Sequence, residues 1–210
     1  MPLQNRVTPS GEIVAVPARG LFMGNRGGRL HRGDRTLSGR RWVSRAWICC
    51  VLEFKGRHRA VWGDSYTELF FLDEPTALAA GHRPCFECRR RDALAFAASW
   101  AAAQQQVAPP RAAEMDRVLH AERLDGRGRG KRRHFLPIDT LPDGTMLTIP
   151  GEPESVFALR HGHLRAWSAD GYGDPRSLPR GIAVDVLTPP SILAVLAQGY
   201  RPHWHPSADS

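Results

Sequence analysis

The chain has 210 residues, a formal net charge of +8 and 42% apolar residues. This length fits one large domain or two small ones, and the apolar fraction is too high for a wholly disordered chain. No stretch approaches the roughly 20 apolar residues that cross a bilayer. The opening MPLQNRVTPSGEIVAVPARG has no apolar block typical of a secretory signal. The membrane and secreted classes are thereby disfavoured, and the expected location is the cytoplasm.

The positive charge comes almost entirely from arginine, since Lys55 and Lys131 are the only lysines. Excess positive charge favours polyanionic partners, because neutralising phosphates releases condensed counterions. An Arg-rich, Lys-poor and Ala-rich composition also follows from a GC-rich genome, which indicates a bacterial source. Charge alone therefore leaves both nucleic-acid contact and a merely solvated basic surface open.

The first half of the chain predicts loops, two strands and a short helix. Residues 1–45 are rich in Gly, Arg and Pro and predict turns with short extended pieces. The segment 46–54, AWICCVLEF, predicts a strand, with Cys50 on the face directed at the core. The segment 66–72, YTELFFL, predicts a second strand antiparallel to the first. The segment 73–81, DEPTALAAG, predicts a short helix with Asp73 or Glu74 as its cap and Gly81 at its end.

The rest of the chain predicts helices and then strands. A long helix is expected from near Glu87 to about residue 106, a second over 112–124 and a third over 191–199, with a basic loop at 125–134. Strands and turns are expected over roughly 139–187. The expected fold is α+β, in three parts: an N-terminal unit at 1–108 with an Arg-rich N-terminal loop, a connector of helix and basic loop at 109–138, and a small β-rich unit at 139–210.

The strongest chemical motif is the C-x-x-C pair formed by Cys85 and Cys88. Two thiolates at this spacing can bind one metal ion from a single tight turn. A structural zinc site needs four ligands, so one such pair is only moderately specific. Two ordinary buried thiols, or a redox pair, are the competing interpretations.

The segments GNRGGRLHR and FFLDEPTALAAGHRPCFECRR together resemble the zinc-binding domain of the Ada DNA-repair family. The resemblance covers roughly residues 22–91 and implies bound Zn²⁺, with Cys85 and Cys88 as one ligand pair. His31 stands at the family's first ligand position, and Arg35 stands where its partner ligand is expected. Because Arg35 cannot bind a metal, the adjacent thiols are the natural replacement, with Cys50 favoured over Cys49.

The same resemblance implies association with DNA but no methyl transfer. Members of the family move the methyl group of a DNA phosphotriester onto a thiolate at the first ligand position, and this chain has His31 there. His82, beside the C-x-x-C turn, is a second-choice ligand or a residue that supports one.

Clusters of basic residues are the candidate contacts to nucleic acid, since guanidinium groups suit phosphate. The competing interpretation is a solvated basic surface. The candidates are Arg26, Arg29, Arg32, Arg35, Arg40, Arg41, Arg89, Arg90, Arg129, Lys131, Arg132 and Arg133. Trp42, Trp47 and Trp62 are interpreted as core residues in preference to stacking planes for bases.

The predicted function is a zinc-stabilised, DNA-associated protein. A hydrolase or nuclease acting on nucleic acid or nucleotides is the alternative, and it would gather His120, Glu122 and His134 in one site. A non-catalytic interaction scaffold is the third possibility. The pairs His161/His163 and His203/His205 could each chelate a metal, but the sequence assigns them no role.

Overall fold

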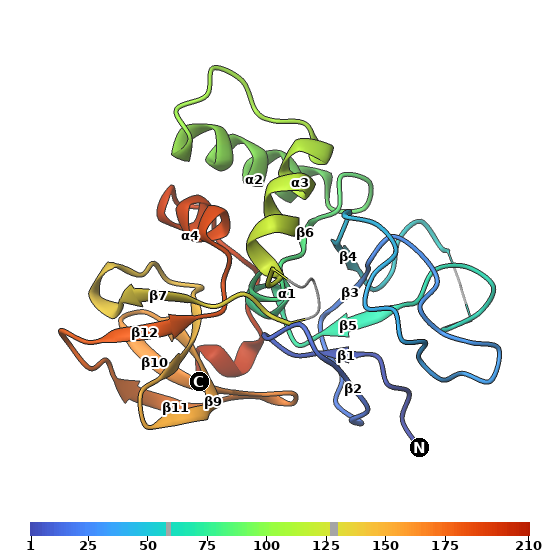
Figure 1. The fold of residues 1–210 in the computed structure, drawn as a ribbon, viewed down its shortest axis with the longest axis horizontal. Coiled ribbons are helices and arrows are strands. Elements are labelled where there is room, and N and C mark those ends of the chain that lie inside the picture. Colours follow the sequence, from blue (N-terminus) through green and yellow to red (C-terminus); the bar gives the residue numbers. More distant parts are fainter. Residues whose placement is uncertain (58–59, 127–129) are drawn as a thin grey trace.

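The computed structural model describes residues 1–57, 60–126 and 130–210 and has an α+β fold. Two six-stranded sheets lie side by side, and three of the four α-helices gather at one end of the molecule (Figure 1). The predicted α+β class is confirmed. Within the described ranges, none of the helices has the length and apolarity that crossing a membrane requires.

The N-terminal sheet has the strand order β2-β1-β5-β3-β4-β6. Its strands are β1 (Arg6–Val7), β2 (Ile13–Val14), β3 (Phe22–Asn25), β4 (Ile48–Val51), β5 (Leu69–Phe71) and β6 (Arg83–Pro84). β3 pairs antiparallel with both β4 and β5. The two strands predicted to pair antiparallel with one another are therefore parallel and separated by β3, so that prediction was wrong.

A glycine allows this close packing of β3. A Cβ added at Gly24 would lie 2.2 Å from the carbonyl oxygen of Ile48 and 2.8 Å from the ring of Phe71. Only glycine leaves room there for both neighbouring strands, so β3 is one of the short extended pieces predicted among the turns of residues 1–45.

Helix α1 (Glu74–Ala79) begins and ends as its sequence predicts. Asp73 is the N-cap and accepts hydrogen bonds from the backbone N–H and the hydroxyl of Thr76, at 3.0 and 2.7 Å. Gly81 follows the helix with φ of +89°, in the left-handed region that favours glycine. All six helical residues are buried, so α1 lies within the core.

The C-terminal sheet has the order β11-β10-β9-β8-β12-β7 and is antiparallel in all its pairings. Its strands are β7 (His134–Pro137), β8 (Met146–Ile149), β9 (Glu152–Arg160), β10 (His163–Ser168), β11 (Gly171–Ser177) and β12 (Ala183–Val186). β7 comes from the segment assigned to the connector, and its pairing with β12 places it in this sheet.

The remaining helices are α2 (Arg90–Ala103), α3 (Ala112–Arg123) and α4 (Pro190–Ala197), with 3-10 turns at Ile138–Thr140 and Pro206–Ala208. α4 packs against α2 and α3, and Leu78 of α1 joins the same apolar core. A second core joins Leu72 and Ala79 to Met146 and Tyr172 of the C-terminal sheet. The two halves of the chain therefore share buried apolar contacts.

Two buried carboxylates stand where these halves meet. Asp73 accepts hydrogen bonds from the Tyr172 hydroxyl at 2.8 Å and from the backbone N–H of His205 at 3.2 Å. Glu74 accepts hydrogen bonds from the Tyr200 hydroxyl at 2.7 Å and from the backbone N–H of His203 at 2.9 Å. The start of α1 thus holds the end of the chain through polar contacts that are shielded from water.

Replacement of Asp73 by Ala should lower the free energy of unfolding by about 3 kcal/mol, since it removes a helix cap and two further buried hydrogen bonds. Urea denaturation would measure the change. Asp34 is the matched control, because it accepts the same pair of hydrogen bonds, from the N–H and hydroxyl of Thr36, on an exposed loop. Asp34→Ala should cost less than about 0.5 kcal/mol. Equal losses in the two variants would contradict the role given to burial.

Candidate metal centre

Three cysteine thiols converge between the N-terminal sheet and the start of α2. The sulfur atoms of Cys50, Cys85 and Cys88 all lie within 4.8 Å of one another. In a tetrahedral zinc site, sulfur atoms bound at about 2.3 Å stand about 3.8 Å apart, so small side-chain adjustments suffice. The three residues are thus close enough to hold one metal ion.

Backbone hydrogen bonds place the C-x-x-C turn against β4. β6 runs parallel to β4, and the N–H of Cys85 donates to the carbonyl of Cys49 at 2.9 Å. The N–H of Arg89 then donates to the carbonyl of Cys85 at 3.0 Å and closes the turn. The short strand β6 therefore delivers Cys85 to the position beside Cys50, and the turn returns Cys88 to the same point.

Hydrogen bonding around Cys85 favours its thiolate. The neighbouring Cys50 and Cys88 side chains lower the pKa of Cys85, and the backbone N–H of Glu87 donates to its sulfur at 3.4 Å. Thiolates are the form that binds metal, so these contacts favour the required charge at Cys85, whereas the pKa values of Cys50 and Cys88 are raised by their neighbours.

The adjacent thiols of β4 point to opposite faces of the sheet. Cys49 is fully buried among the apolar residues of the N-terminal core, where burial raises the pKa of its thiol. Cys50 faces the other two thiols. The prediction that Cys50, not Cys49, joins Cys85 and Cys88 agrees with the three clustered thiols. The reason given for it was wrong, because Cys49 is the one on the face directed at the apolar core.

His31 does not join the three thiols. Its Nδ1 lies 2.7 Å from the Thr67 hydroxyl and its Nε2 lies 2.9 Å from the carbonyl oxygen of Gly63. Its ring also stacks on that of Trp62, with centroids 5.2 Å apart. Both ring nitrogens therefore have protein partners, and this corrects the expectation that His31 is a ligand.

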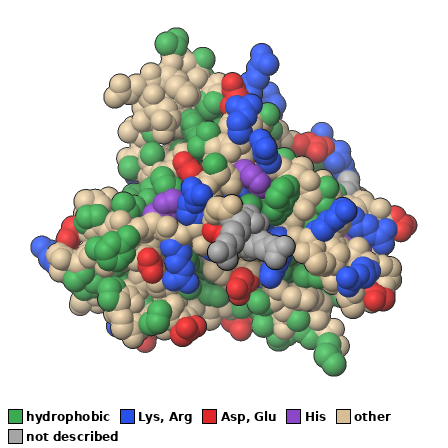
Figure 2. Space-filling view, in the orientation of Figure 1, with side chains coloured by type: hydrophobic (Ala, Val, Ile, Leu, Met, Phe, Trp, Pro, Cys, Tyr) green, Lys and Arg blue, Asp and Glu red, His purple; other side chains and the backbone are tan. Residues whose placement is uncertain are grey.

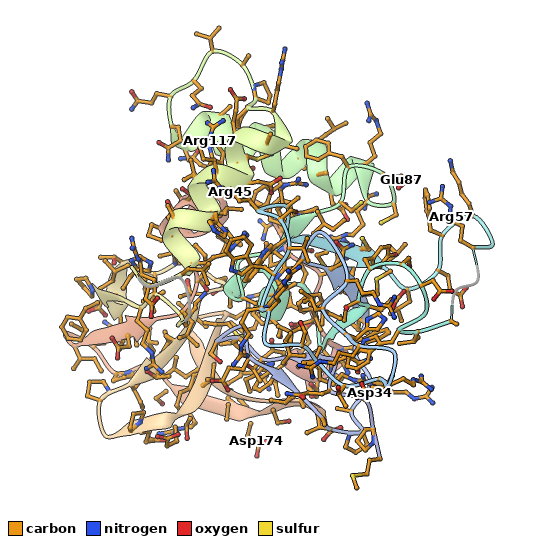
Figure 3. All side chains as sticks on the ribbon, turned by 45° about the vertical axis from the view of Figure 1, so that its right-hand side comes forward. Asp34, Arg45, Arg57, Glu87, Arg117 and Asp174 are labelled. Carbon is orange, nitrogen blue, oxygen red and sulfur yellow. The ribbon has the colours of Figure 1, made fainter. Side chains whose placement is uncertain are left out.

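A cavity of about 370 Å³ adjoins the three thiols. Among the described residues, no fourth histidine, cysteine or carboxylate belongs to the thiol group. Glu87 lines the cavity, but its carboxylate pairs with Arg57 at 2.8 Å, and Figure 3 shows these two side chains on neighbouring loops. A fourth donor would therefore come from the side of this cavity.

His82, the second-choice ligand, is fully buried away from the thiols. Its ring packs edge-on against Phe71 and tilted against Trp47. Burial, together with nearby Arg26 and Arg123, lowers the pKa of His82, so the ring is neutral.

The candidate nucleic-acid contacts divide into exposed and buried residues. The exposed ones are Arg29, Arg32, Arg35, Arg40, Arg41, Arg90, Arg132 and Arg133, with Lys131 partly exposed. Arg26 and Arg89 are buried. Arg89 forms ion pairs with Glu74 and Asp92, each at 2.8 Å, so the expectation that it contacts phosphate is corrected. Arg129 lies outside the described residues.

The histidine and carboxylate groups of the alternative enzyme hypothesis do not assemble. The Glu122 carboxylate accepts hydrogen bonds from the N–H and hydroxyl of Ser191, at the start of α4. The Nε2 of His134 lies 3.2 Å from the backbone carbonyl oxygen of Glu122, and the Nδ1 of His120 lies 3.0 Å from the guanidinium of Arg123. Glu122 thus has a structural role, and nothing in this arrangement favours the hydrolase hypothesis.

Comparison with known proteins identifies no relative. No protein-family model matches the chain, and no curated protein or solved structure matches it at a significant level. Function must therefore be argued from the residues themselves.

Replacement of Cys50, Cys85 or Cys88 by Ser should abolish metal binding, because each removes one of three thiolate donors. Elemental analysis of the purified proteins would measure metal per chain. The matched control is Cys49→Ser, which makes the same change at the neighbouring residue and should retain the metal. His31→Ala should also retain it. Metal loss in the Cys49 variant, with metal kept in the Cys50 variant, would show that this grouping is wrong.

Proposed function

We propose that this is a zinc-stabilised protein that associates with DNA through its phosphates and carries no methyl-transfer activity. The observation that supports the zinc part is the convergence of Cys50, Cys85 and Cys88. Thiolate ligands select Zn²⁺ among the common divalent ions, and a closed turn of this kind typically has a structural role. A structural role then requires a fourth donor, which would be a group from the adjoining cavity.

Unpaired arginines of one loop region support the DNA part. Residues 29–45 contain a single carboxylate, Asp34, which is hydrogen-bonded to Thr36. The exposed arginines of this region are Arg29, Arg32, Arg35, Arg40, Arg41 and Arg45. None of these six has an ion pair with a described residue. Guanidinium groups without carboxylate partners are available for phosphate oxygens.

The resemblance of residues 22–91 to the Ada zinc-binding domain is consistent with this proposal. The absence of methyl transfer follows from His31, because an imidazole whose two nitrogens are hydrogen-bonded does not replace a metal-bound thiolate nucleophile.

Binding to a DNA duplex should weaken steeply with salt. About four phosphate contacts would lower the affinity roughly a hundredfold between about 50 mM and about 200 mM salt. Fluorescence anisotropy with a labelled duplex would measure this slope. A salt-independent affinity would contradict the phosphate-contact proposal.

A charge-matched pair of variants tests the location of the contacts. Arg32→Gln/Arg40→Gln should reduce both the affinity and the salt slope, since each lost phosphate contact lowers the slope by about one. Arg180→Gln/Arg201→Gln removes the same charge from exposed positions in the C-terminal half and should bind as the wild type does. Equal weakening by both pairs would indicate a general charge effect and not a binding loop.

A further inference from the structure

A second cavity, of about 640 Å³, lies where the N-terminal segment, the end of α3 and the C-terminal sheet meet. Figure 2 shows several separate Lys and Arg side chains on this face of the molecule, with Asp and Glu side chains among them. Five cationic residues line the cavity: Arg26, Arg41, Arg123, Lys131 and Arg133. It holds none of the three clustered thiols, so it is separate from the candidate metal centre.

Two of these cations are buried against one tryptophan. Arg26 and Arg123 are each 1% exposed, and their guanidinium carbons lie 3.9 and 3.8 Å from the ring centroid of Trp47. Arg26 directly follows β3 and Arg123 is the last residue of α3, so the two are far apart in the sequence. The sequence pattern gave Arg123 no role. Its only signal is a charged residue at the end of a helix, and that pattern is common on solvated surfaces.

Neither guanidinium forms an ion pair with a carboxylate in the part of the chain that the structure describes. Arg26 donates to the carbonyl of Gly11, and Arg123 donates to the carbonyls of Gly81 and Arg45, all at 2.8 Å. No ion pair to a described carboxylate involves Arg26, Arg123 or Lys131. Glu12 and Glu154 line the same cavity without pairing to them.

Two buried donors remain unused at this place. The Nε of Arg123 and the Nε1 of Trp47 have no hydrogen-bond partner among the described residues, and both residues line the cavity. Burial lowers the pKa of Arg26 and Arg123, and repulsion by Arg41 and Arg26, respectively, lowers it further. Buried charges of one sign are costly to the fold unless an opposite charge joins them.

We infer that this cavity binds the phosphate group of a small phosphorylated molecule, held by Arg26, Arg123 and Lys131. The guanidinium group is the side chain best suited to phosphate oxygens. The cavity volume falls within the roughly 300–1,000 Å³ of small-molecule sites. Arg26 and Arg123 are almost inaccessible, so a stiff duplex on the surface cannot reach them. A small anion would have to enter the cavity, where the Nε of Arg123 has no partner among the described residues. Arg26 and Arg123 are thus distinct from the proposed DNA contacts, although Arg41 of the DNA-contacting loop also lines the cavity.

Equilibrium dialysis with labelled inorganic phosphate and pyrophosphate tests the inference on the metal-loaded full chain. The expected result is saturable binding of one anion per chain that persists at constant ionic strength. Arg123→Gln, which keeps a donor for the Gly81 carbonyl, should raise the dissociation constant about tenfold or more, because charge-assisted hydrogen bonds are the strong ones. Lys131→Gln alters a partly exposed side chain and provides a second test should the Arg123 variant fail to fold.

Arg117→Gln is the matched control, since it makes the same charge change at an exposed position of the same helix. It should bind phosphate as the wild type does. The inference is overturned if the wild type shows no saturable binding of phosphate or pyrophosphate. It is overturned as well if the Arg117 variant loses as much affinity for the anion as both cavity variants do. It is also overturned if a single-stranded oligonucleotide displaces the bound phosphate while a 5′-mononucleotide does not. Phosphate binding that survives Arg32→Gln/Arg40→Gln would separate this site from the DNA contacts.

Discussion

The buried carboxylates of Asp73 and Glu74 are the constraint on which the rest of this structure depends. A carboxylate removed from water must be hydrogen-bonded or paired, and these two obtain their partners from their own helix and from three other parts of the chain. The partners come from α1 itself, from β11, from the segment that follows α4, and from Arg89 at the start of α2. The helix cap that the sequence predicts therefore also fixes how the C-terminal sheet and helix α4 meet the N-terminal sheet.

The candidate metal centre lies directly beside this network. Arg89 follows Cys88 in the sequence, pairs with Glu74, and donates to the sulfur of Cys49 at 3.4 Å. A metal ion bound by Cys88 would therefore fix the position of the next residue, Arg89, which neutralises the buried carboxylate of Glu74. This connection gives a physical reason for a metal in a chain that already has sizeable apolar cores: it would keep one buried ion pair in place.

Features set by local chemistry could be predicted from the sequence, whereas features set by distant contacts could not. The capped helix α1 and the strand around Cys50 were predicted because their signals lie within a few residues. Periodicity shows that Cys49 and Cys50 face opposite ways, but which face meets the core depends on how β4 packs. His31 matched a family position along the chain, yet its ring nitrogens are taken by Thr67 and Gly63, which no local pattern reveals. The zinc-domain resemblance and the DNA association stay predictions.

Because Cys49 and Cys50 point in opposite directions, the reactivity of the cysteines would report both whether the chain is folded and whether it has bound metal. In the metal-free native protein, a thiol reagent small enough to enter the cavity would react with the three cysteines that line it. It would not react with Cys49, which is fully buried in the apolar core. Metal would mask the three, and only unfolding would release the fourth. The number of modified cysteines would therefore distinguish loaded, empty and unfolded chains in a single mass spectrum.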